Sequence, residues 1–204
     1  MATGRLYTMS APSGAGKTSL VKALLQSVSG LQVSVSHTTR TQRSGEQHGE
    51  DYFFTERADF EQMVSDGRFL EQAEVFGNFY GTSKQAVLDL LEQGVDVLLE
   101  IDWQGAAQVR QQMPETISIF ILPPSKEALQ ERLTARGQDN AEVITGRMAQ
   151  ALSEMSHYHE ADYLVINDDF AQALEELQHI LAAERLRCTV QGEQQQKLLA
   201  SLLA

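Results

Sequence analysis

The segment Ala11-Pro-Ser-Gly-Ala-Gly-Lys-Thr18 constrains this chain more than any other feature. It matches the pattern G-x-x-x-x-G-K-[ST] at every defined position except the first. A strand pattern at Arg5–Ser10 precedes it and a helix pattern at Ser19–Gln26 follows it, as such a loop requires. We predict an anion-binding loop for nucleotide phosphates, with Lys17 on the β- and γ-phosphates and Thr18 on Mg²⁺. The alternative is a glycine-rich surface turn without a ligand.

Composition limits the classes of protein to which this chain can belong. Its 204 residues, 42% of them hydrophobic, suffice for one domain with a small inserted lobe. The net charge of −12 argues against binding along nucleic-acid backbones, although local arginine clusters can still hold small nucleotides. The single cysteine, Cys188, excludes an internal disulfide, and no signal-peptide core or membrane-length apolar run occurs. We expect a cytoplasmic protein with no membrane and no nucleic-acid partner.

Strand and helix patterns alternate along most of the chain, which is typical of an α/β domain with a largely parallel sheet. Further strand patterns lie at 31–36, 95–101, 117–122 and 163–166. Further helix patterns lie at 83–93, from Ser125 to before Arg136, at 142–157 and at 170–186.

The pattern changes between residues 34 and 84. Short strands at 52–54 and 69–76, a short helix at 58–64 and a turn at Gly77-Asn78 predict a small, mainly antiparallel lobe inserted into the sheet. The core then comprises residues 4–33 and 85–187. Residues 188–204 form a C-terminal tail whose leucines could pack on another subunit, giving a homo-oligomer, or on the same domain.

Acidic residues end the apolar strand predicted at 95–101. Ligands bind at the carboxyl ends of strands in an open α/β sheet, so Asp102 should lie beside the phosphate loop and reach Mg²⁺ directly or through water. Glu100 alternates with Asp102, and its carboxylate is costly to bury unpaired, which makes it a second candidate. Taken singly, Asp102 could be an ordinary turn residue.

A first arginine pair lies in the polar loop 37–51. Arg40 and Arg43 are three residues apart, and Tyr52 follows them. Two guanidinium groups and a phenol suit a phosphate monoester. Glu71 and Tyr80 on the same predicted lobe favour this interpretation over a solvated basic loop.

A second set of arginines surrounds a glycine-containing turn. Arg132 and Arg136 lie four apart on one helix face, and Arg147 lies on the next helix. Together they could close over a transferred phosphoryl group and stabilise its charge. The alternative is surface ion pairing with Glu131 and Glu142.

A series of short motifs occurs in order over roughly residues 5–187. They are Ser10–Thr18, Val35–Arg40, Gly49–Phe54, Phe69–Glu71, Gly77–Thr82, Glu100–Gly105, Leu122–Ser125, Arg132–Gly137 and Val165–Asp169. This series resembles the guanylate kinase family, which moves phosphate from ATP to GMP. The resemblance implies a three-layer αβα core of the P-loop NTPase type with a parallel sheet, a GMP-binding lobe at 34–84 and an arginine-bearing lid at about 132–147.

The resemblance also implies a reaction and a set of site residues. ATP and GMP would give ADP and GDP, in purine nucleotide metabolism and GMP recycling, with Mg²⁺ as the cofactor. The implied ATP-binding residues are Ala11, Pro12, Ser13, Gly14, Ala15, Gly16, Lys17, Thr18 and Asn167. The implied GMP-binding residues are Ser36, Arg40, Arg43, Tyr52, Glu71, Tyr80, Thr82 and Asp102. The implied catalytic residues are Lys17, Arg132, Arg136 and Arg147, and the implied metal contacts are Thr18, with Glu100 and Asp102 through water.

Two positions depart from the family pattern, in which glycine is common at Ala11 and aspartate at Glu100. Guanine selection has a separate physical reason. Guanine offers N1–H and N2–H₂ as adjacent donors, and an ionised carboxylate such as Glu71 accepts from both. Adenine presents an acceptor at N1, which leaves the carboxylate unmatched at a cost of about 1–3 kcal/mol or more.

Two rival functions fit parts of the pattern. Guanylate-kinase-like domains of scaffold proteins bind phosphorylated peptides without catalysis, but they typically lose the phosphate loop that this chain retains at Gly16-Lys17-Thr18. A kinase of another monophosphate, or a plain NTPase, would not require Glu71 together with Ser36. An acceptor screen discriminates among these alternatives.

Overall fold

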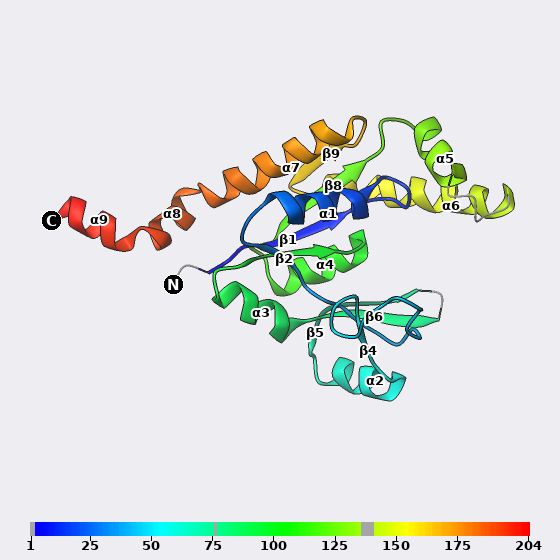
Figure 1. Cartoon of the computed structure of the whole chain (residues 1–204), viewed down its shortest axis with the longest axis horizontal. Helices are drawn as coiled ribbons and strands as arrows, with labels where there is room; N and C mark the ends of the chain where they lie inside the picture. Colours follow the sequence, from blue (N-terminus) through cyan, green and yellow to red (C-terminus); the bar gives the residue numbers. More distant parts are fainter. Residues whose placement is uncertain (1–2, 76, 136–140) are drawn as a thin grey trace.

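A parallel sheet forms the middle layer of the core (Figure 1). The computed structural model describes residues 3–75, 77–135 and 141–204. Within these residues, five parallel strands lie in the order β2-β7-β1-β8-β9. Their bounds are Leu6–Ser10 (β1), Leu31–Val33 (β2), Asp96–Glu100 (β7), Ile117–Leu122 (β8) and Tyr163–Ile166 (β9).

Helices cover both faces of this sheet. On one face, α1 (Lys17–Ser27) and α7 (Phe170–Arg185) bury their apolar stripes against Tyr7 and Met9 of β1. On the other face, α3 (Lys84–Glu92) and α4 (Trp103–Gln112) pack against Leu6. Side chains alternate along a strand, so the two faces of β1 supply both cores. The predicted three-layer αβα core is confirmed.

A second sheet forms the lobe below the core in Figure 1. Its order is β4-β3-β6-β5, with β3 parallel to β4 and the other pairings antiparallel. The bounds are His37–Thr38 (β3), Phe53–Phe54 (β4), Phe69–Val75 (β5) and Asn78–Ser83 (β6), and α2 spans Arg57–Ser65. Phe60 of α2 stacks on Phe69 and Phe79 at centroid distances of 4.6 and 5.6 Å, which gives the lobe its own core. The predicted mainly antiparallel lobe is confirmed.

Two helical units extend from opposite ends of the core. At one end, α5 (Lys126–Ala135) packs on α6 (Ala141–Met155), which continues into the 3₁₀ helix η1 (Ser156–Glu160). At the other end, α8 (Cys188–Gln194) and α9 (Gln196–Leu203) project from the body (Figure 1). The predicted tail is therefore helical.

Several expected elements differ from the observed ones. The largest error is α4, which the sequence patterns did not predict: of its ten residues only Gly105 and Val109 are buried, so it carries no apolar stripe. The strand predicted at 31–36 ends at Val33, where the chain leaves the sheet for the lobe. Asn78, predicted to lie in the turn at Gly77-Asn78, instead begins β6 and pairs with Val75.

Candidate active site

The phosphate loop joins β1 to α1 and requires glycine at two places. Gly14 and Gly16 both have φ of +91°, a left-handed conformation that favours glycine. A Cβ at Gly16 would also lie only 2.4 Å from Nδ2 of Asn167. Gly16 caps α1, so the positive end of that helix points into a cavity of about 290 Å³. The cavity is lined by the loop and by Glu154.

Asn167 and Arg132 hold the loop from the side of α5. The side-chain amide Nδ2 of Asn167 donates to the backbone carbonyl of Ala15 at 2.7 Å, and the backbone carbonyl of Asn167 accepts from Arg132 Nη2 at 3.0 Å. The second terminal nitrogen of Arg132, Nη1, is buried without a hydrogen-bond partner in the part of the chain that the structure describes. A guanidinium donor therefore stands beside the loop, ready for an acceptor.

Lys17 and Thr18 open α1 and contact the end of β7. The Lys17 ammonium donates to the carbonyl of Ile101 at 2.9 Å, and the Thr18 hydroxyl donates to Glu100 Oε1 at 2.5 Å. Burial lowers the pKa of Lys17, whereas the carboxylates of Glu100, Asp102 and Glu154 act in the opposite direction. A bound anion would stabilise the charged ammonium further.

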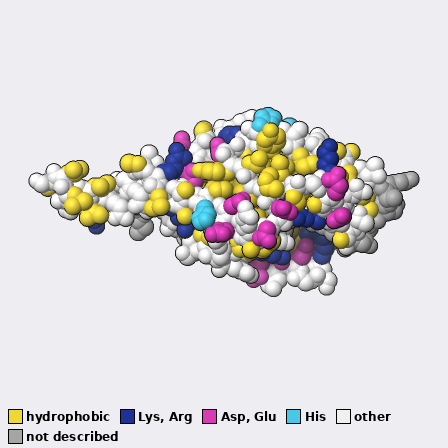
Figure 2. All heavy atoms as spheres, turned by 90° about the horizontal axis from the view of Figure 1, so that it is seen from above, with side chains coloured by type: hydrophobic (Ala, Val, Ile, Leu, Met, Phe, Trp, Pro, Cys, Tyr) yellow, Lys and Arg dark blue, Asp and Glu magenta, His cyan; other side chains and the backbone are white. Residues whose placement is uncertain are grey.

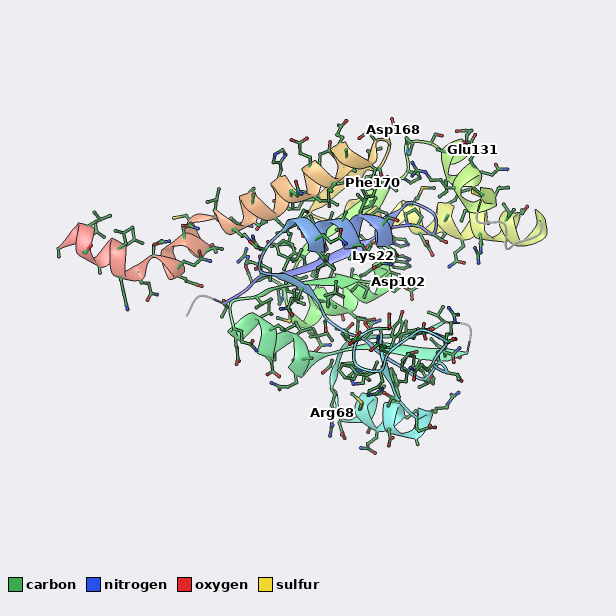
Figure 3. All side chains as sticks on the ribbon, viewed as in Figure 1. Lys22, Arg68, Asp102, Glu131, Asp168 and Phe170 are labelled. Carbon is green, nitrogen blue, oxygen red and sulfur yellow. The ribbon has the colours of Figure 1, made fainter. Side chains whose placement is uncertain are left out.

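A buried carboxylate lies where the lobe meets the core. Glu71 of β5 is 6% exposed, and its Oε1 accepts from the Thr82 hydroxyl of β6 at 2.6 Å. Burial raises the pKa of Glu71, and the nearby Asp102 adds to the rise. Asp102 caps α4, accepting from the Gly105 N–H at 2.7 Å, and Figure 3 shows it on the side of the core that faces the lobe. A Cβ at Gly105 would lie 3.2 Å from Glu71 Oε2, so α4 closely approaches this carboxylate.

The lobe also gathers Arg40, Tyr52 and Tyr80. The Arg40 guanidinium lies 5.5 Å from the centroid of the Tyr52 ring, and the two tyrosine rings are 5.9 Å apart. Glu46 pairs with Arg40 at 2.7 Å, and this hydrogen bond, with a smaller effect from Tyr80, raises the pKa of Arg40. Arg43 is exposed, and its backbone N–H donates to Glu46 at 2.8 Å. The Glu46 carboxylate therefore already pairs with the Arg40 guanidinium in this group of residues.

Ser36 and Arg147 are two further residues expected at the site. Ser36 lies just before β3, and its carbonyl accepts from the Phe53 N–H at 2.9 Å. Arg147 lies half-buried on α6. Arg136 lies outside the described residues.

Other residues at the site were missed by sequence reasoning. Glu154 lies two helical turns after Arg147 on α6, and its Oε2 accepts from the Ser13 N–H at 3.3 Å. A glutamate near the end of a helix gives no sequence signal for such a contact. Trp103, directly after Asp102, stacks on His157 with ring centroids 3.4 Å apart. Nothing in the residue spacing indicates that stack.

Comparison with known proteins places this geometry in a family. The model of the family described as guanylate kinase matches residues 3–184. The chain belongs to the guanylate kinase family. It is 59% identical to the guanylate kinase of Escherichia coli strain K12 over 206 residues, covering both chains completely. It is also 59% identical to the guanylate kinase of Saccharophagus degradans over 202 residues, covering 99% of this chain and 98% of the other.

A solved structure supports the same assignment. The crystal structure of guanylate kinase from Anaplasma phagocytophilum superposes with a TM-score of 0.74 at 36% identity, covering 92% of this chain and 89% of that one. The family resemblance and the expected class of enzyme, an ATP-dependent nucleoside monophosphate kinase, are confirmed. Among the described residues, no helix combines the length and apolar character needed to span a membrane.

Proposed function

We propose that this chain transfers the γ-phosphoryl group of ATP to GMP, giving ADP and GDP, through the residues described above. Family membership supports the reaction. The observation that carries the choice of acceptor is the buried pair of Glu71 and Thr82 where the lobe meets the core. A scaffold module without catalysis has no need of the intact loop at Gly16-Lys17-Thr18.

In this proposal the guanine base is recognised by four residues, Glu71, Thr82, Asp102 and Ser36. The ionised Glu71 carboxylate accepts from N1–H and N2–H₂ of guanine, and the Thr82 hydroxyl fixes its orientation. Burial makes the match selective, because an unmatched carboxylate here loses hydrogen bonds that water cannot replace. Adenine offers an acceptor at N1 and is rejected.

The phosphate of GMP binds to Arg40, Arg43, Tyr52 and Tyr80. Glu46 now neutralises Arg40 at 2.7 Å, and an incoming phosphate dianion would take its place. Arginine suits this role because its planar guanidinium binds two phosphate oxygens at once. The exposed Arg43 lies on the same loop and can swing onto the same phosphate.

The phosphates of ATP bind to the loop at 11–18, and Asn167 lies near the adenine. The residues present also fit Mg²⁺, because Thr18 and Glu100 offer hard oxygen atoms at one point beside the loop. Thr18 would hold the ion, with Glu100 and Asp102 acting through water. When bound, Mg²⁺ neutralises charge on the β- and γ-phosphates.

Transfer needs no covalent enzyme intermediate. A phosphate oxygen of GMP attacks the γ-phosphorus in line, and the bond to the ADP oxygen breaks. Lys17, Arg132, Arg136 and Arg147 stabilise the charge on the transferred group. Arg132 supports this role best, because its Nη1 is buried and has no hydrogen-bond partner among the described residues. Closure of lobe and lid would exclude water, and small-angle scattering with a bisubstrate analogue should show a smaller radius of gyration.

An acceptor screen tests the proposed reaction. ADP release from Mg·ATP is measured in turn with GMP, AMP, UMP and dTMP, with no acceptor as the control. GMP should support release at least a hundredfold faster than AMP. Equal rates with AMP would refute the base assignment, and equal rates without an acceptor would indicate a plain NTPase.

We also propose that the tail joins copies of this chain in the cytoplasm. Leu198, Leu199, Leu202 and Leu203 of α9 are 41–86% exposed, and Figure 2 shows hydrophobic side chains along the projecting tail. Such a face on an amphipathic helix is stabilised by burial against a second apolar surface. A second copy offers the same leucines.

A further inference from the structure

One short segment at the end of α6 contacts both sides of the nucleotide site. Glu154, in the last turn of α6, accepts from the Ser13 N–H of the phosphate loop. His157, three residues later in η1, stacks on Trp103 with the ring planes only 8° apart. Trp103 begins α4 and directly follows Asp102. The segment 154–157 therefore links the phosphate loop to the residue proposed to lie beside the base.

The Glu154 carboxylate occupies a position that suits a phosphate oxygen. It lines the cavity of the phosphate loop, and its charge acts on Lys17. Gln150, one turn earlier, donates to Glu154 Oε1 at 2.9 Å and holds the side chain toward the loop. A polyphosphate binds the same backbone N–H groups of the loop, and at this distance its negative charge repels the Glu154 carboxylate. The phosphate loop therefore cannot bind the polyphosphate and the Glu154 carboxylate at the same time. A bound polyphosphate displaces the carboxylate.

The stacked rings of His157 and Trp103 have space to move when Glu154 is displaced. A cavity of about 280 Å³ lies against it, lined by Trp103, His157, Ala106, Phe120 and Ser10 among others. The edge of the imidazole contacts Glu160, with Nδ1 2.6 Å from Oε1. His157 and Glu160 can therefore shift as a unit over the indole without displacing packed core atoms.

We propose that Glu154 and His157 are positioning residues that couple the two subsites. A polyphosphate on the loop releases Glu154 from Ser13, the segment 154–157 moves, and the stack shifts Trp103 together with the cap of α4 at Asp102. The inference rests on the proposed function for the ligand of the loop. An anion bound to the phosphate loop thus changes the positions of Trp103 and Asp102, on the guanine side, before GMP binds.

The only tryptophan of the sequence, Trp103, allows a direct test. The full chain is titrated with sodium tripolyphosphate while tryptophan fluorescence is followed, and binding is measured separately by calorimetry. The wild type should bind and change its fluorescence. Glu154→Gln should bind about fivefold more tightly, because one repelling charge is removed, and its fluorescence should start nearer to the bound value.

A matched charge removal provides the control. Glu131 lies exposed on α5 (Figure 3), and Glu131→Gln changes the net charge equally without touching the loop. Equal tripolyphosphate affinity in Glu154→Gln and Glu131→Gln would overturn the proposed role of Glu154. A wild type that does not bind tripolyphosphate at all would instead refute the phosphate loop and with it the proposed function.

The stack is tested by two variants of His157. In His157→Ala the fluorescence response should fall at least fivefold, while the affinity for tripolyphosphate stays within twofold of the wild type. In His157→Phe, which keeps a flat ring over the indole, at least half of the response should return. A full response in His157→Ala, or none in a His157→Phe protein that still binds tripolyphosphate, would overturn the coupling.

Discussion

At the scale of single residues, Gly16 carries two independent constraints. Its φ of +91° disfavours any side chain, and a Cβ there would lie 2.4 Å from the Asn167 amide. We expect Gly16→Ala to cost about 1–2 kcal/mol from the backbone alone and to weaken ATP binding more than tenfold. Thermal unfolding and ATP calorimetry measure the two effects. Gly67→Ala, also at positive φ but with open space around it, shows the cost of the backbone conformation by itself.

The buried Glu71 carboxylate sets a conflict between stability and recognition. The raised pKa of Glu71 means that the folded state favours the protonated form. Ionisation of Glu71 therefore lowers the free energy of unfolding at neutral pH. This cost becomes smaller as the pH drops through the raised pKa. We expect Glu71→Gln to stabilise the free protein by about 0.5–1 kcal/mol at pH 7.5, and by less at pH 5. The same variant should lose roughly ten- to hundredfold in kcat/KM for GMP.

The same group predicts how the affinity for GMP depends on pH. Guanine presents donors, so only the ionised carboxylate binds it, and a protonated Glu71 places a third donor opposite them. We therefore expect KM for GMP to rise on acidification, beginning at a higher pH than an ordinary carboxyl would cause. A KM that stays flat until the ordinary carboxyl range would contradict the assignment, and Glu71→Gln should remove the dependence.

Residue types in the sequence predicted a set of candidate site residues, but not all of their contacts. The side chains of Lys17, Thr18, Glu100 and Asp102 lie near one another because the carboxyl ends of parallel strands share one edge. Glu154 escaped prediction because a lone glutamate on a helix resembles any solvated residue. Its contact with Ser13 depends on how α6 packs on α5, which residue spacing does not fix.

At the scale of elements, the residue that caps the N-terminus of α4 also belongs to the candidate site. Asp102 caps the helix and also lies beside Glu71 and Lys17. Asparagine caps helices about as well as aspartate, so Asp102→Asn should keep stability within roughly 0.5 kcal/mol while kcat falls more than tenfold. Asp102→Ala should lose about 1 kcal/mol as well. Ser83→Ala removes the cap of α3, where the hydroxyl accepts from the Ala86 N–H, and is the control that should cost stability alone.

Strong local patterns predicted elements well, and tertiary pairing supplied the remainder. Strands β8 and β9 have the expected bounds because both are short apolar runs bounded by turn residues. β3 consists of two residues that are a strand only through pairing with β4 and β6, which no local pattern encodes. The helix α4 depends on its cap and on packing beside the lobe rather than on periodicity.

At the scale of the whole molecule, the tail should control assembly without affecting chemistry. Deleting residues 196–204 removes α9 and its exposed leucines but leaves the buried Val190 of α8 in place. We expect the truncated chain to sediment as a monomer, while the full chain forms a larger species, with kcat within twofold. Sedimentation velocity at several concentrations measures the difference. Identical species would remove the tail as the interface.

The start of β1 and the helices α8 and α9 lie at the same pole of the body, away from α5 (Figure 1). Buried charges secure that pole, where Asp96 accepts from the Arg5 N–H and from Arg185 at 2.7 Å each. A tether attached at the amino end would therefore pull on a part of the body that these hydrogen bonds hold in place. Enzyme immobilised in this orientation should present the cavity of the phosphate loop away from the support and keep its turnover.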